Sequence, residues 1–492
     1  LMRSALYPEN ARLASVETSI HNLIDYAFVV HTHPTLINGL MCSKKAKELS
    51  GEIFGDEALF IPFTIPGYDL FKAIESGLDE YRKNHNSEPK LLLLENHGVF
   101  VSADTIEEIK TIYDDLYKKL RKHIQKDIPE GEIDFSAEIT DILPGIRAIF
   151  SRNQRKIVKI RNNELVKGFL GDDTKLDTVR KPFILDHIKY CGAAYVWDDL
   201  KKHADAEAFL VSIKGTLAEF EKKNGRLPEL MIIKNLGLIS VASNVRSAEA
   251  LLDVFEDQMK ISFYARNFGG EQALPDKEIG KISLREEHER KISASEGRAD
   301  IVRNKVIVVT GGAQGFGKGI VEELYREGAN IVLADINEEK GQETALEISK
   351  DNANNKVVFV KTDVSSFESF GNLVFESVKE FGAVDAFISN AGILRAGNLD
   401  EMDPKTFDLM TKINYSAYFY GTKAFNPVFM LQNKYNKTMF FDVIQVNSKS
   451  GLKGSNKNFA YAGGKFGGIG LTQSFALEMM PYNVKVNSIC PG

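Results

Sequence analysis

Cysteine, tryptophan and long apolar runs are scarce in this chain of 492 residues. It has one tryptophan and three cysteines, and Cys42, Cys191 and Cys490 lie far apart without a C-x-x-C pair. This spacing argues against a disulfide framework and against a cysteine metal site. No apolar run approaches the roughly 20 residues that span a bilayer, and we read no secretory signal. We therefore expect a protein of the reducing cytoplasm with no membrane partner.

An excess of positive charge is also absent. Lys and Arg number 62 against 68 Asp and Glu, which gives a net charge of −6. Nucleic-acid binding usually needs a basic stripe, so we expect no nucleic-acid partner. Hydrophobic residues make up 43% and charged residues 26%, as in globular proteins, and this length corresponds to two to four domains at about 150 residues each.

Short apolar, β-rich runs alternate with amphipathic stretches from Lys305 onward. Such alternation predicts βαβ units, and right-handed crossovers between them give an α/β fold with a Rossmann-type doubly wound parallel sheet. The expected strands are residues 306–310, 331–334, 357–361, 386–389, 443–447 and 484–487.

Glycines follow the first of these strands. In Thr310-Gly311-Gly312-Ala313-Gln314-Gly315-Phe316-Gly317, three glycines supply a tight turn, close approach to a pyrophosphate and close helix packing. The phosphates would lie on the N-terminus of the helix that begins near Gly317. Asp335 ends the next strand, where a carboxylate accepts hydrogen bonds from a ribose 2′-hydroxyl and repels a 2′-phosphate. The sequence therefore predicts NAD rather than NADP as the cofactor.

Tyr461 and Lys465 form a Y-x-x-x-K unit, with Ser448 upstream. Residues i and i+4 share one face of a helix, so the Lys465 ammonium is expected beside the Tyr461 phenol, where it favours loss of the phenol proton. Tyr461 can then act as an acid or a base near neutral pH.

These motifs together resemble the short-chain dehydrogenase/reductase family over residues 304–492. The family's T-G-x-x-x-G-x-G matches residues 310–317, its N-A-G matches residues 390–392, and its P-G after the sixth strand matches residues 491–492. The resemblance implies cofactor contacts for Thr310, Gly311, Gln314, Gly315, Phe316, Gly317, Asp335, Ile336, Asp363, Val364, Asn390, Ala391, Gly392, Tyr461, Lys465, Pro491 and Gly492.

The same resemblance implies catalytic roles. Tyr461 would exchange a proton with the substrate oxygen, and Lys465 would hold the nicotinamide ribose. Ser448 would hydrogen-bond the substrate oxygen, and Asn414 would support a proton-relay water.

The sequence departs from the family pattern in two places. Asn447 precedes Ser448 where the family has a serine pair, and Gly463 with Gly464 is expected to loosen the helix that bears Tyr461. The family's substrate loop would follow Gly492, so we expect the sequence to be cut at this end.

Three histidines in the first half have the spacing of metal ligands. His31-Thr32-His33 ends an apolar run, and alternation along a strand sends both imidazoles to the same face. His97 follows the apolar run 91–94 and precedes Gly98. Three nitrogen ligands with one open position are what a catalytic Zn²⁺ needs to polarise a carbonyl oxygen. We therefore predict a zinc site at these histidines.

These residues resemble the class II aldolase/adducin family, which includes the zinc-dependent fuculose- and rhamnulose-phosphate aldolases. A glutamate precedes the H-x-H pair in that family, and Ser15-Val16-Glu17 fits its Ser-x-Glu-like element. The resemblance implies that Glu17 is the acid/base that moves a proton at the carbon next to the substrate carbonyl. The family's phosphate-binding loop would precede Leu1, so we expect a cut at this end too.

Residues 90–100 and 229–239 share a pattern of an apolar strand, Asn-x-Gly and a second strand, which suggests a degenerate internal repeat. Leu236 stands in the second copy where His97 stands in the first, so the second copy would only pack. Charged residues 126–163 look like a connector. We expect an N-terminally cut class II aldolase/adducin-like domain over residues 1–125, an aldolase-associated region with the repeat over 126–290, a linker over 291–303 and a C-terminally cut NAD-binding short-chain dehydrogenase domain over 304–492.

This pair of domains resembles the bifunctional class II aldolase/short-chain dehydrogenases of rhamnose catabolism, the rhamnulose-1-phosphate aldolase/lactaldehyde dehydrogenase type. The resemblance implies NAD and Zn²⁺ as cofactors and cleavage of a ketose 1-phosphate to a small aldehyde, which the second site would oxidise or reduce. It also implies a homo-oligomer, as a tetramer. Two alternatives stay open, and both keep a sugar or polyol dehydrogenase. In one the first domain is a non-catalytic adducin-like binding or assembly module, and in the other it is an aldolase that acts on an unrelated substrate.

Overall fold

The computed structural model describes residue 15 and residues 17–293, 301–350 and 354–492. The chain forms two compact units. We name them the first unit, residues 1–132, 163–194 and 253–295, and the second unit, residues 133–162, 195–252 and 296–492.

The first unit is built on a four-stranded sheet with the order β1-β4-β3-β2. Strand β4 pairs antiparallel with β1 and β3, whereas β2 pairs parallel with β3. Alternate side chains of β3 and β4 enter two separate apolar clusters, so both faces of the sheet are buried. The strands are β1 (Phe28–Thr32), β2 (Ala58–Ile61), β3 (Leu91–Leu94) and β4 (Gly98–Ala103).

Helices surround this sheet. The Thr105 side chain caps the N-terminus of α5, and Asn86 ends α4 in the left-handed conformation. The helices wholly within the first unit are α1 (Thr18–His21), α2 (Thr35–Met41), α3 (Ala46–Phe54), α4 (Tyr68–His85), α5 (Ile106–Arg121), α7 (Glu164–Leu170), α8 (Asp173–Thr178), α9 (Leu185–Cys191) and α12 (Asp276–Ser293).

The second unit contains another four-stranded sheet, with the order β5-β8-β7-β6. Its pairing repeats that of the first sheet: β8 is antiparallel to β5 and β7, and β6 is parallel to β7. Asn96 before β4 and Asn235 before β8 both have left-handed backbone angles, with φ of 52° and 65°. The elements are α6 (Ile139–Phe150), β5 (Ile157–Arg161), β6 (Val196–Asp199), α10 (Ala206–Asn224), β7 (Leu230–Lys234), β8 (Gly237–Ala242) and the beginning of α11 (Val245–Ala265).

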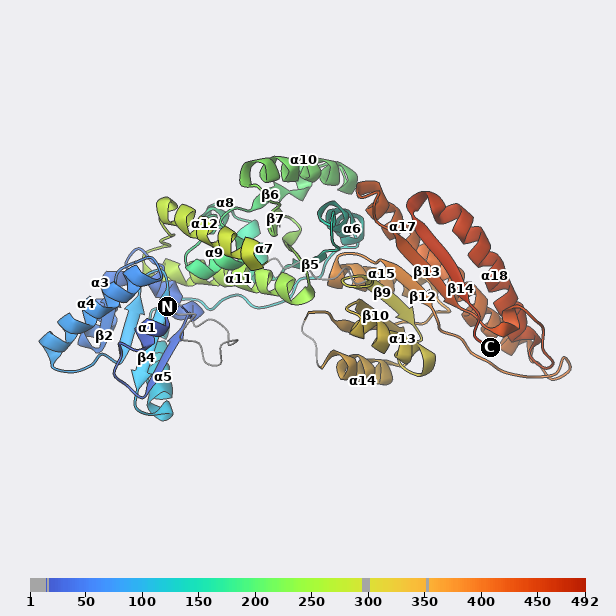
Figure 1. Cartoon of the computed structure of the whole chain (residues 1–492), viewed down its shortest axis with the longest axis horizontal. Coiled ribbons are helices and arrows are strands. Elements are labelled where there is room, and N and C mark those ends of the chain that lie inside the picture. Colours follow the sequence, from blue (N-terminus) through green and yellow to red (C-terminus); the bar gives the residue numbers. More distant parts are fainter. Residues whose placement is uncertain (1–14, 16, 294–300, 351–353) are drawn as a thin grey trace. The chain divides into compact units, whose positions relative to one another are not determined.

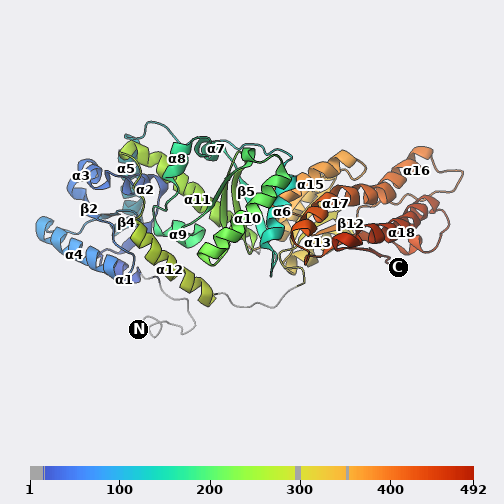
Figure 2. The same cartoon turned by 90° about the horizontal axis from the view of Figure 1, so that it is seen from above.

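The rest of the second unit is a six-stranded parallel sheet with the order β11-β10-β9-β12-β13-β14. The strand order reverses between β9 and β12, which confirms the predicted doubly wound α/β fold. Helices α13 and α14 lie together in Figure 1, and α15 runs beside α17 in Figure 2. The strands are β9 (Val306–Thr310), β10 (Asn330–Asp335), β11 (Val357–Lys361), β12 (Ala386–Ser389), β13 (Phe441–Val446) and β14 (Val484–Ile489). The helices are α13 (Gly315–Arg326), α14 (Glu338–Ser349), α15 (Phe367–Phe381), α16 (Pro404–Thr411), a π-helical turn (Lys412–Ser416), α17 (Ala417–Tyr435) and α18 (Phe459–Met479).

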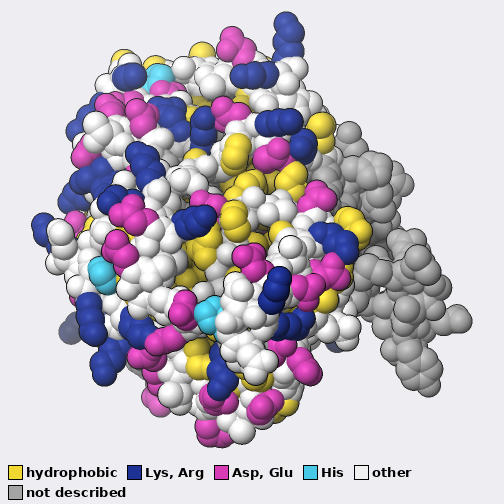
Figure 3. All heavy atoms as spheres, turned by 90° about the vertical axis from the view of Figure 1, so that its left-hand side faces the viewer, with side chains coloured by type: hydrophobic (Ala, Val, Ile, Leu, Met, Phe, Trp, Pro, Cys, Tyr) yellow, Lys and Arg dark blue, Asp and Glu magenta, His cyan; other side chains and the backbone are white. Residues whose placement is uncertain are grey.

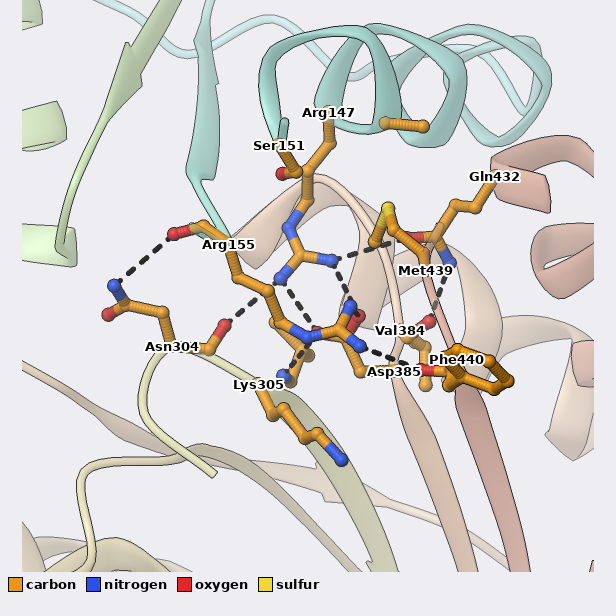
Figure 4. A network of polar contacts seen from close by, with 12 residues as sticks. Arg147, Ser151, Arg155, Asn304, Lys305, Val384, Asp385, Gln432, Met439 and Phe440 are labelled. Atoms are coloured by element: carbon orange, nitrogen blue, oxygen red, sulfur yellow. Dashed lines mark hydrogen bonds and ion pairs between the residues drawn. The ribbon is translucent and has the colours of Figure 1, made fainter. Parts of the chain in front are cut away.

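The predicted connector over residues 126–163 was wrong, because this segment contains α6 and β5. Most side chains of α6 are buried, including Arg147, and β5 pairs with β8. Figure 4 shows Arg147 and Arg155 from this segment meeting Asp385 of the six-stranded sheet. The predicted aldolase-associated region at 126–290 therefore differs from the observed units, which divide it. Most of the predicted linker at 291–303 lies outside the described residues.

Among the described residues, no helix combines the length and the apolar character that crossing a bilayer requires. Figure 3 shows positive and negative side chains interspersed on the face that it draws, with apolar side chains near the centre. That face presents no field of one sign.

Candidate active sites

Three histidines of the first unit come together at the end of β1. His31 is the fourth residue of β1, His33 follows the strand, and His97 lies in the turn between β3 and β4. One ring nitrogen from each lies within 4.8 Å of the others. The structure therefore brings together the residues that the sequence predicts as metal ligands.

The Nδ1 atoms of His31 and His33 each have a hydrogen-bond partner. His31 Nδ1 lies 3.0 Å from the Val99 carbonyl oxygen, and His33 Nδ1 lies 2.8 Å from a carboxylate oxygen of Asp186. Both partners only accept hydrogen bonds, so in the neutral rings each Nδ1 carries the proton and each Nε2 has a lone pair. These two Nε2 atoms are 3.1 Å apart.

That arrangement fits a bound cation. Ligands about 2.0–2.1 Å from a tetrahedral zinc ion are roughly 3.3 Å from one another, close to the observed separation. Two lone pairs facing at this distance repel unless a positive charge lies between them. His31 stacks on Phe100 with 4.0 Å between ring centres, which fixes its ring plane.

The turn before β4 also needs its glycine. A Cβ atom at Gly98 would lie 2.5 Å from both His33 Cδ2 and the Thr32 carbonyl oxygen. The neighbouring Asn96 donates hydrogen bonds to the carbonyl oxygens of Phe183 and Gln272, at 3.0 and 2.8 Å. The turn that carries His97 is thus held by segments distant in sequence.

Glu17 lies against the histidines from the N-cap of α1. One of its carboxylate oxygens is 3.1 Å from His97 Nε2 and 3.6 Å from His31 Nε2. Burial alone would raise the pKa of Glu17, but the His97 hydrogen bond and the charges of the three imidazoles outweigh it and lower the pKa to about 2. Burial lowers the pKa of His31 to about 4, and His97 lowers it further. At neutral pH the site therefore pairs a carboxylate with a neutral His31.

Within the part of the chain that the structure describes, the second copy of this sheet has no such cluster. Ile160 pairs with Ile239 as His31 pairs with Phe100, so the positions of His31, His33 and His97 correspond to Ile160, Asn162 and Leu236. None of the three replacements offers an imidazole, so the second copy keeps the fold without the ligand set.

The turn after β9 has the backbone geometry that a phosphate cradle requires. Gly311 and Gly315 have φ of 64° and 58°, which favour glycine. A Cβ at Gly317 would lie 1.9 Å from the Gly311 carbonyl oxygen and 2.6 Å from Asn390 Nδ2. The Gln314 side chain does not cap α13, and the Phe316 side chain is exposed. The uncapped N-terminus of a helix is a favourable place for an anion.

The loops after the neighbouring strands meet this turn. Asp335 accepts hydrogen bonds from the backbone of Ala313 and Asn337, at 3.1 and 3.0 Å, and Ile336 beside it is exposed. Asn390 donates to the carbonyl oxygens of Thr310 and Gly311, at 2.9 and 3.1 Å.

Two further loops close the site. The Thr310 hydroxyl accepts a hydrogen bond from the backbone of Ala391, at 3.2 Å. After β11, Asp363 accepts hydrogen bonds from the backbone and hydroxyl of Ser365, at 2.9 and 2.8 Å, which turns the loop around Val364. These loops lie at the carboxyl edge of the parallel sheet, where a nucleotide binds in such folds.

Tyr461 and Lys465 share one side of α18. The Lys465 ammonium lies 5.5 Å from the centre of the Tyr461 ring and donates to the Val446 carbonyl oxygen at 2.8 Å. Burial lowers the pKa of Lys465 to about 8, against a small opposing contribution from Cys490. Ser448 follows β13, and its hydroxyl accepts a hydrogen bond from the backbone of Ser450.

Asn414 lies in the π-helical turn before α17. Its side chain accepts from the Ile393 backbone at 3.0 Å and donates to the Ile393 carbonyl oxygen at 2.8 Å. Gly392 passes close to it, because a Cβ there would lie 3.0 Å from the Asn414 amide oxygen. The side chain of Asn414 thus holds the loop after Asn390.

Comparisons with known proteins agree with this geometry. The family model described as short chain dehydrogenase matches residues 305–492. A trans-4-hydroxycyclohexanecarboxylate dehydrogenase of Sinomonas cyclohexanicum is 33% identical over 198 residues, which cover 39% of this chain and 74% of the relative. The chain belongs to the short-chain dehydrogenase family.

Two other relatives show how far the resemblance extends. The sorbitol-6-phosphate 2-dehydrogenase of Escherichia coli is 32% identical over 189 residues, which cover 38% of this chain and 71% of the relative. The uncharacterized oxidoreductase YuxG of Bacillus subtilis is 22% identical over 510 residues, which cover 97% of this chain and 72% of that protein. The model of the class II aldolase and adducin N-terminal domain matches residues 3–117. This short-chain dehydrogenase is therefore an oxidoreductase joined to a class II aldolase/adducin-like domain.

Asn447, which the sequence pattern marks only as a departure from the family, contacts two of the candidate catalytic residues. Asn447 accepts from the Ser448 backbone at 2.8 Å and donates to the Lys465 carbonyl oxygen at 2.9 Å, so it links both residues. The expected loosening at Gly463 is not seen, because α18 is continuous. Its neighbour Gly464 lets α18 approach Asn414, since a Cβ there would lie 3.3 Å from the Asn414 Cβ. The departure from the family's serine pair was the available signal for Asn447.

The loop at Pro491 meets the site through the backbone. The Pro491 carbonyl oxygen accepts a hydrogen bond from Lys449, and Ile489 accepts one from Asn447. Gly492 follows directly. The residue after Ser448 is thereby fixed against the end of β14.

Proposed function

We propose that the chain is a bifunctional enzyme: an NAD-dependent oxidoreductase for an alcohol or aldehyde, joined to a zinc-dependent enzyme that cleaves a ketose 1-phosphate by a retro-aldol reaction. The observation that carries the proposal is the Glu17 carboxylate, 3.1 Å from His97 Nε2 within the three-histidine cluster. A binding module has no need of a half-buried carboxylate beside three clustered imidazoles.

In the dehydrogenase, Tyr461 takes the proton of the substrate hydroxyl as the alcohol is oxidised, and returns it when the carbonyl is reduced. Ser448 orients the substrate oxygen, and Lys465 provides a positive charge beside the phenol. When bound, the nicotinamide takes up the hydride lost from the carbinol carbon. Among the described residues no group hydrogen-bonds the Tyr461 hydroxyl, which leaves it for the substrate.

Asp335 supports NAD rather than NADP. Its carboxylate lies at the end of β10, where the adenosine ribose binds in this fold, and its two oxygens are fixed by backbone N–H groups. A 2′-phosphate would meet this negative charge directly, whereas a 2′-hydroxyl can donate to it.

In the aldolase-like domain, the cluster fits zinc because its three candidate donors are imidazoles, and the Nε2 atoms of His31 and His33 have free lone pairs. When bound, the metal withdraws electrons from the substrate carbonyl. Glu17 takes the proton of the hydroxyl that becomes the aldehyde as the carbon–carbon bond breaks, and gives it to the carbon next to the ketone carbonyl, which keeps the bonding electron pair. His31 stays neutral. The Phe100 ring and the Val99 carbonyl hold His31 in place.

The resemblance to the class II aldolase family and the chemistry of the two sites support the substrate class. Cleavage of a ketose 1-phosphate such as rhamnulose 1-phosphate gives dihydroxyacetone phosphate and a small aldehyde. An aldehyde such as lactaldehyde is then a substrate for the dehydrogenase. One relative carries sorbitol-6-phosphate in its name, which also favours a polyol or sugar phosphate.

A second candidate function keeps the dehydrogenase, acting on a sugar or polyol, and makes the first unit a binding or assembly module. The observation that favours it is the second sheet, which keeps the same strand order with Ile160, Asn162 and Leu236 in place of the ligands. The same four-stranded sheet can therefore form without the three histidines.

The deciding experiment measures zinc content and NAD binding of the full-length protein. Three proteins are compared: the wild type, His31→Ala/His33→Ala, and His85→Ala/His123→Ala, which removes two exposed imidazoles away from the cluster. We expect about one zinc per chain in the wild type and in the control, none in His31→Ala/His33→Ala, and NAD binding in all three.

Release of dihydroxyacetone phosphate from ketose 1-phosphates then tests the lyase. Zinc without any such release would leave the dehydrogenase standing and contradict the retro-aldol activity. NAD binding with no zinc in the wild type would favour the module.

Helix α18 supports assembly into a homo-oligomer such as a tetramer. It is rich in apolar residues, yet its Phe466 and Leu477 side chains are 47% and 75% exposed. A helix of this kind is normally covered. Light scattering of the purified protein measures the number of chains, and a monomer would contradict this assembly.

A further inference from the structure

One carboxylate at the histidine cluster comes from outside the segment that matches the class II aldolase model. Asp186 lies in the first turn of α9, beyond the matched residues 3–117. Its Oδ2 atom is 2.8 Å from His33 Nδ1, although the two residues are 153 positions apart in sequence. Both belong to the first unit.

This contact determines which nitrogen of His33 faces the cluster. A carboxylate only accepts hydrogen bonds, so the proton of the neutral ring stays on Nδ1. The lone pair is then on Nε2, the atom that lies 3.1 Å from His31 Nε2. A carboxylate behind an imidazole also makes the ring a stronger electron donor toward a cation.

The helix that carries Asp186 is fixed on both sides. His187 Nδ1 accepts a hydrogen bond from the Phe183 backbone at 3.2 Å, and the Phe183 carbonyl oxygen accepts one from Asn96 at 3.0 Å. Ile188 packs with Leu274 in an apolar cluster. The turn of His97 and the helix of Asp186 therefore hold each other in place.

We propose that Asp186 is a positioning residue of the metal site, which fixes the ring orientation and the protonated nitrogen of His33 so that Nε2 points at a divalent cation. This inference rests on the proposed metal-dependent function. The helix α9, which lies between the two repeats in sequence, would then support the metal site of the first repeat.

The competing explanation is an ordinary ion pair between Asp186 and a protonated His33. The two differ in what they predict for metal binding. An ion pair alone contributes to stability and leaves no reason for a change in metal affinity when the carboxylate becomes an amide. A positioning residue changes the affinity, because an amide can offer His33 Nδ1 a donor as readily as an acceptor.

The test titrates the metal-free, full-length protein with Zn²⁺ against a chromophoric chelator, and with Co²⁺ followed by its visible absorption. The variants are Asp186→Asn, Asp186→Glu and Asp177→Asn. Asp177 lies in the same segment and makes an exposed ion pair with Arg180, so it is the matched control. Thermal unfolding of each metal-free protein accompanies the titration.

We expect Asp186→Asn to weaken Zn²⁺ binding about 10- to 100-fold and to change the Co²⁺ spectrum, which reports ligand geometry. Asp186→Glu should restore part of the affinity, Asp177→Asn should match the wild type, and the metal-free proteins should unfold alike. Equal zinc affinity of Asp186→Asn and wild type would overturn this inference while the metal site stands. A wild type that binds neither metal, like His31→Ala/His33→Ala, would overturn both proposals.

Discussion

Arg147 and Asp385 form an ion pair with no solvent exposure on either side chain. Two nitrogens of the guanidinium donate to the two carboxylate oxygens, at 3.0 and 2.7 Å, and Arg155 donates to the same carboxylate (Figure 4). The pair joins α6 to the residue before β12, so α6 and the six-stranded sheet share one buried charge network. The pKa of Asp385 would rise on burial, but the charges of both arginines keep it below its usual range.

Replacing the buried carboxylate should destabilise the second unit. Asp385→Asn leaves the buried Arg147 and the partly buried Arg155 without their shared counter-charge, which we expect to cost about 3–5 kcal/mol of unfolding free energy at pH 7. Asp385 has a lowered pKa in the folded state, so its stabilisation is present above about pH 4 and is lost as the pH falls further. Chemical denaturation at pH 7 and pH 3 should therefore show the difference between variant and wild type shrinking in acid. Asp400→Asn, at an exposed position, is the control, and an equal loss in both variants would contradict the prediction.

Removing the buried ammonium of Lys465 should abolish activity without lowering the stability of the fold. Lys465→Met should abolish oxidoreduction yet unfold no more easily than wild type at pH 7. The pKa of Lys465 falls from 10.5 to about 8 in the folded state, so the buried charge costs roughly 3 kcal/mol there.

The folded protein releases this proton before the unfolded chain does, so wild type gains stability relative to Lys465→Met between about pH 8 and 10.5. Denaturation at pH 7 and pH 10 measures the change. Lys405→Met, which removes an exposed ammonium, should show neither effect. A Lys465→Met variant that is less stable than wild type at pH 7 would show that the bond to Val446 outweighs the buried charge.

Two glycines of one helix should respond oppositely to alanine. Gly317→Ala places a Cβ 1.9 Å from the Gly311 carbonyl oxygen, so the phosphate cradle must open and NAD binding should fall at least tenfold. Gly319→Ala has no atom within 4 Å of the new Cβ and should stabilise the helix by about 0.5–1 kcal/mol. Calorimetric titration with NAD measures the first effect and thermal unfolding the second. Similar NAD affinities for the two variants would exclude the cradle as the cofactor site.

Loss of the link between Ser448 and Lys465 should slow catalysis. Asn447→Ala removes hydrogen bonds at 2.8 and 2.9 Å from a buried position, which should cost about 1–3 kcal/mol of stability. We expect kcat to fall about tenfold, because the hydroxyl of Ser448 and the helix of Tyr461 are no longer held together. Asn456→Ala in the exposed loop nearby is the control. An unchanged kcat in a folded Asn447→Ala protein would show that Asn447 only packs.

Removing the hydroxyl group of Tyr461 tests the proton transfer in the dehydrogenase. Tyr461→Phe keeps the ring beside Lys465 and should lower kcat about 100- to 10,000-fold, the range for loss of a general acid or base. Tyr420→Phe removes a hydroxyl from a tyrosine of α17 whose ring contacts Phe419, and should keep the wild-type rate. Steady-state kinetics with an alcohol and NAD measures both. Comparable rates in both variants would assign the proton transfer elsewhere.

Short-range patterns made much of the dehydrogenase predictable. The strands Val306–Thr310, Val357–Lys361 and Ala386–Ser389 were predicted to the residue, because each is a short apolar run bounded by loop residues. The segment at 126–163 was misjudged because its charged beginning hides the apolar face of α6, and Arg147 looks like a surface residue in one dimension. Its burial depends on Asp385, 238 residues away.

The sequence by itself determined the features that depend on near neighbours. These are the doubly wound sheet, the glycine turn, the shared face of Tyr461 and Lys465, and the pairing of His31 with His33 on one strand. Only the tertiary structure decided that Asp186 stands behind His33, that Asn447 joins Ser448 to Lys465, and that Arg147 is neutralised by Asp385. Except within the Asn447–Ser448 step, these contacts join residues far apart in the chain. Their distances depend on how whole elements pack, and no local spacing encodes them.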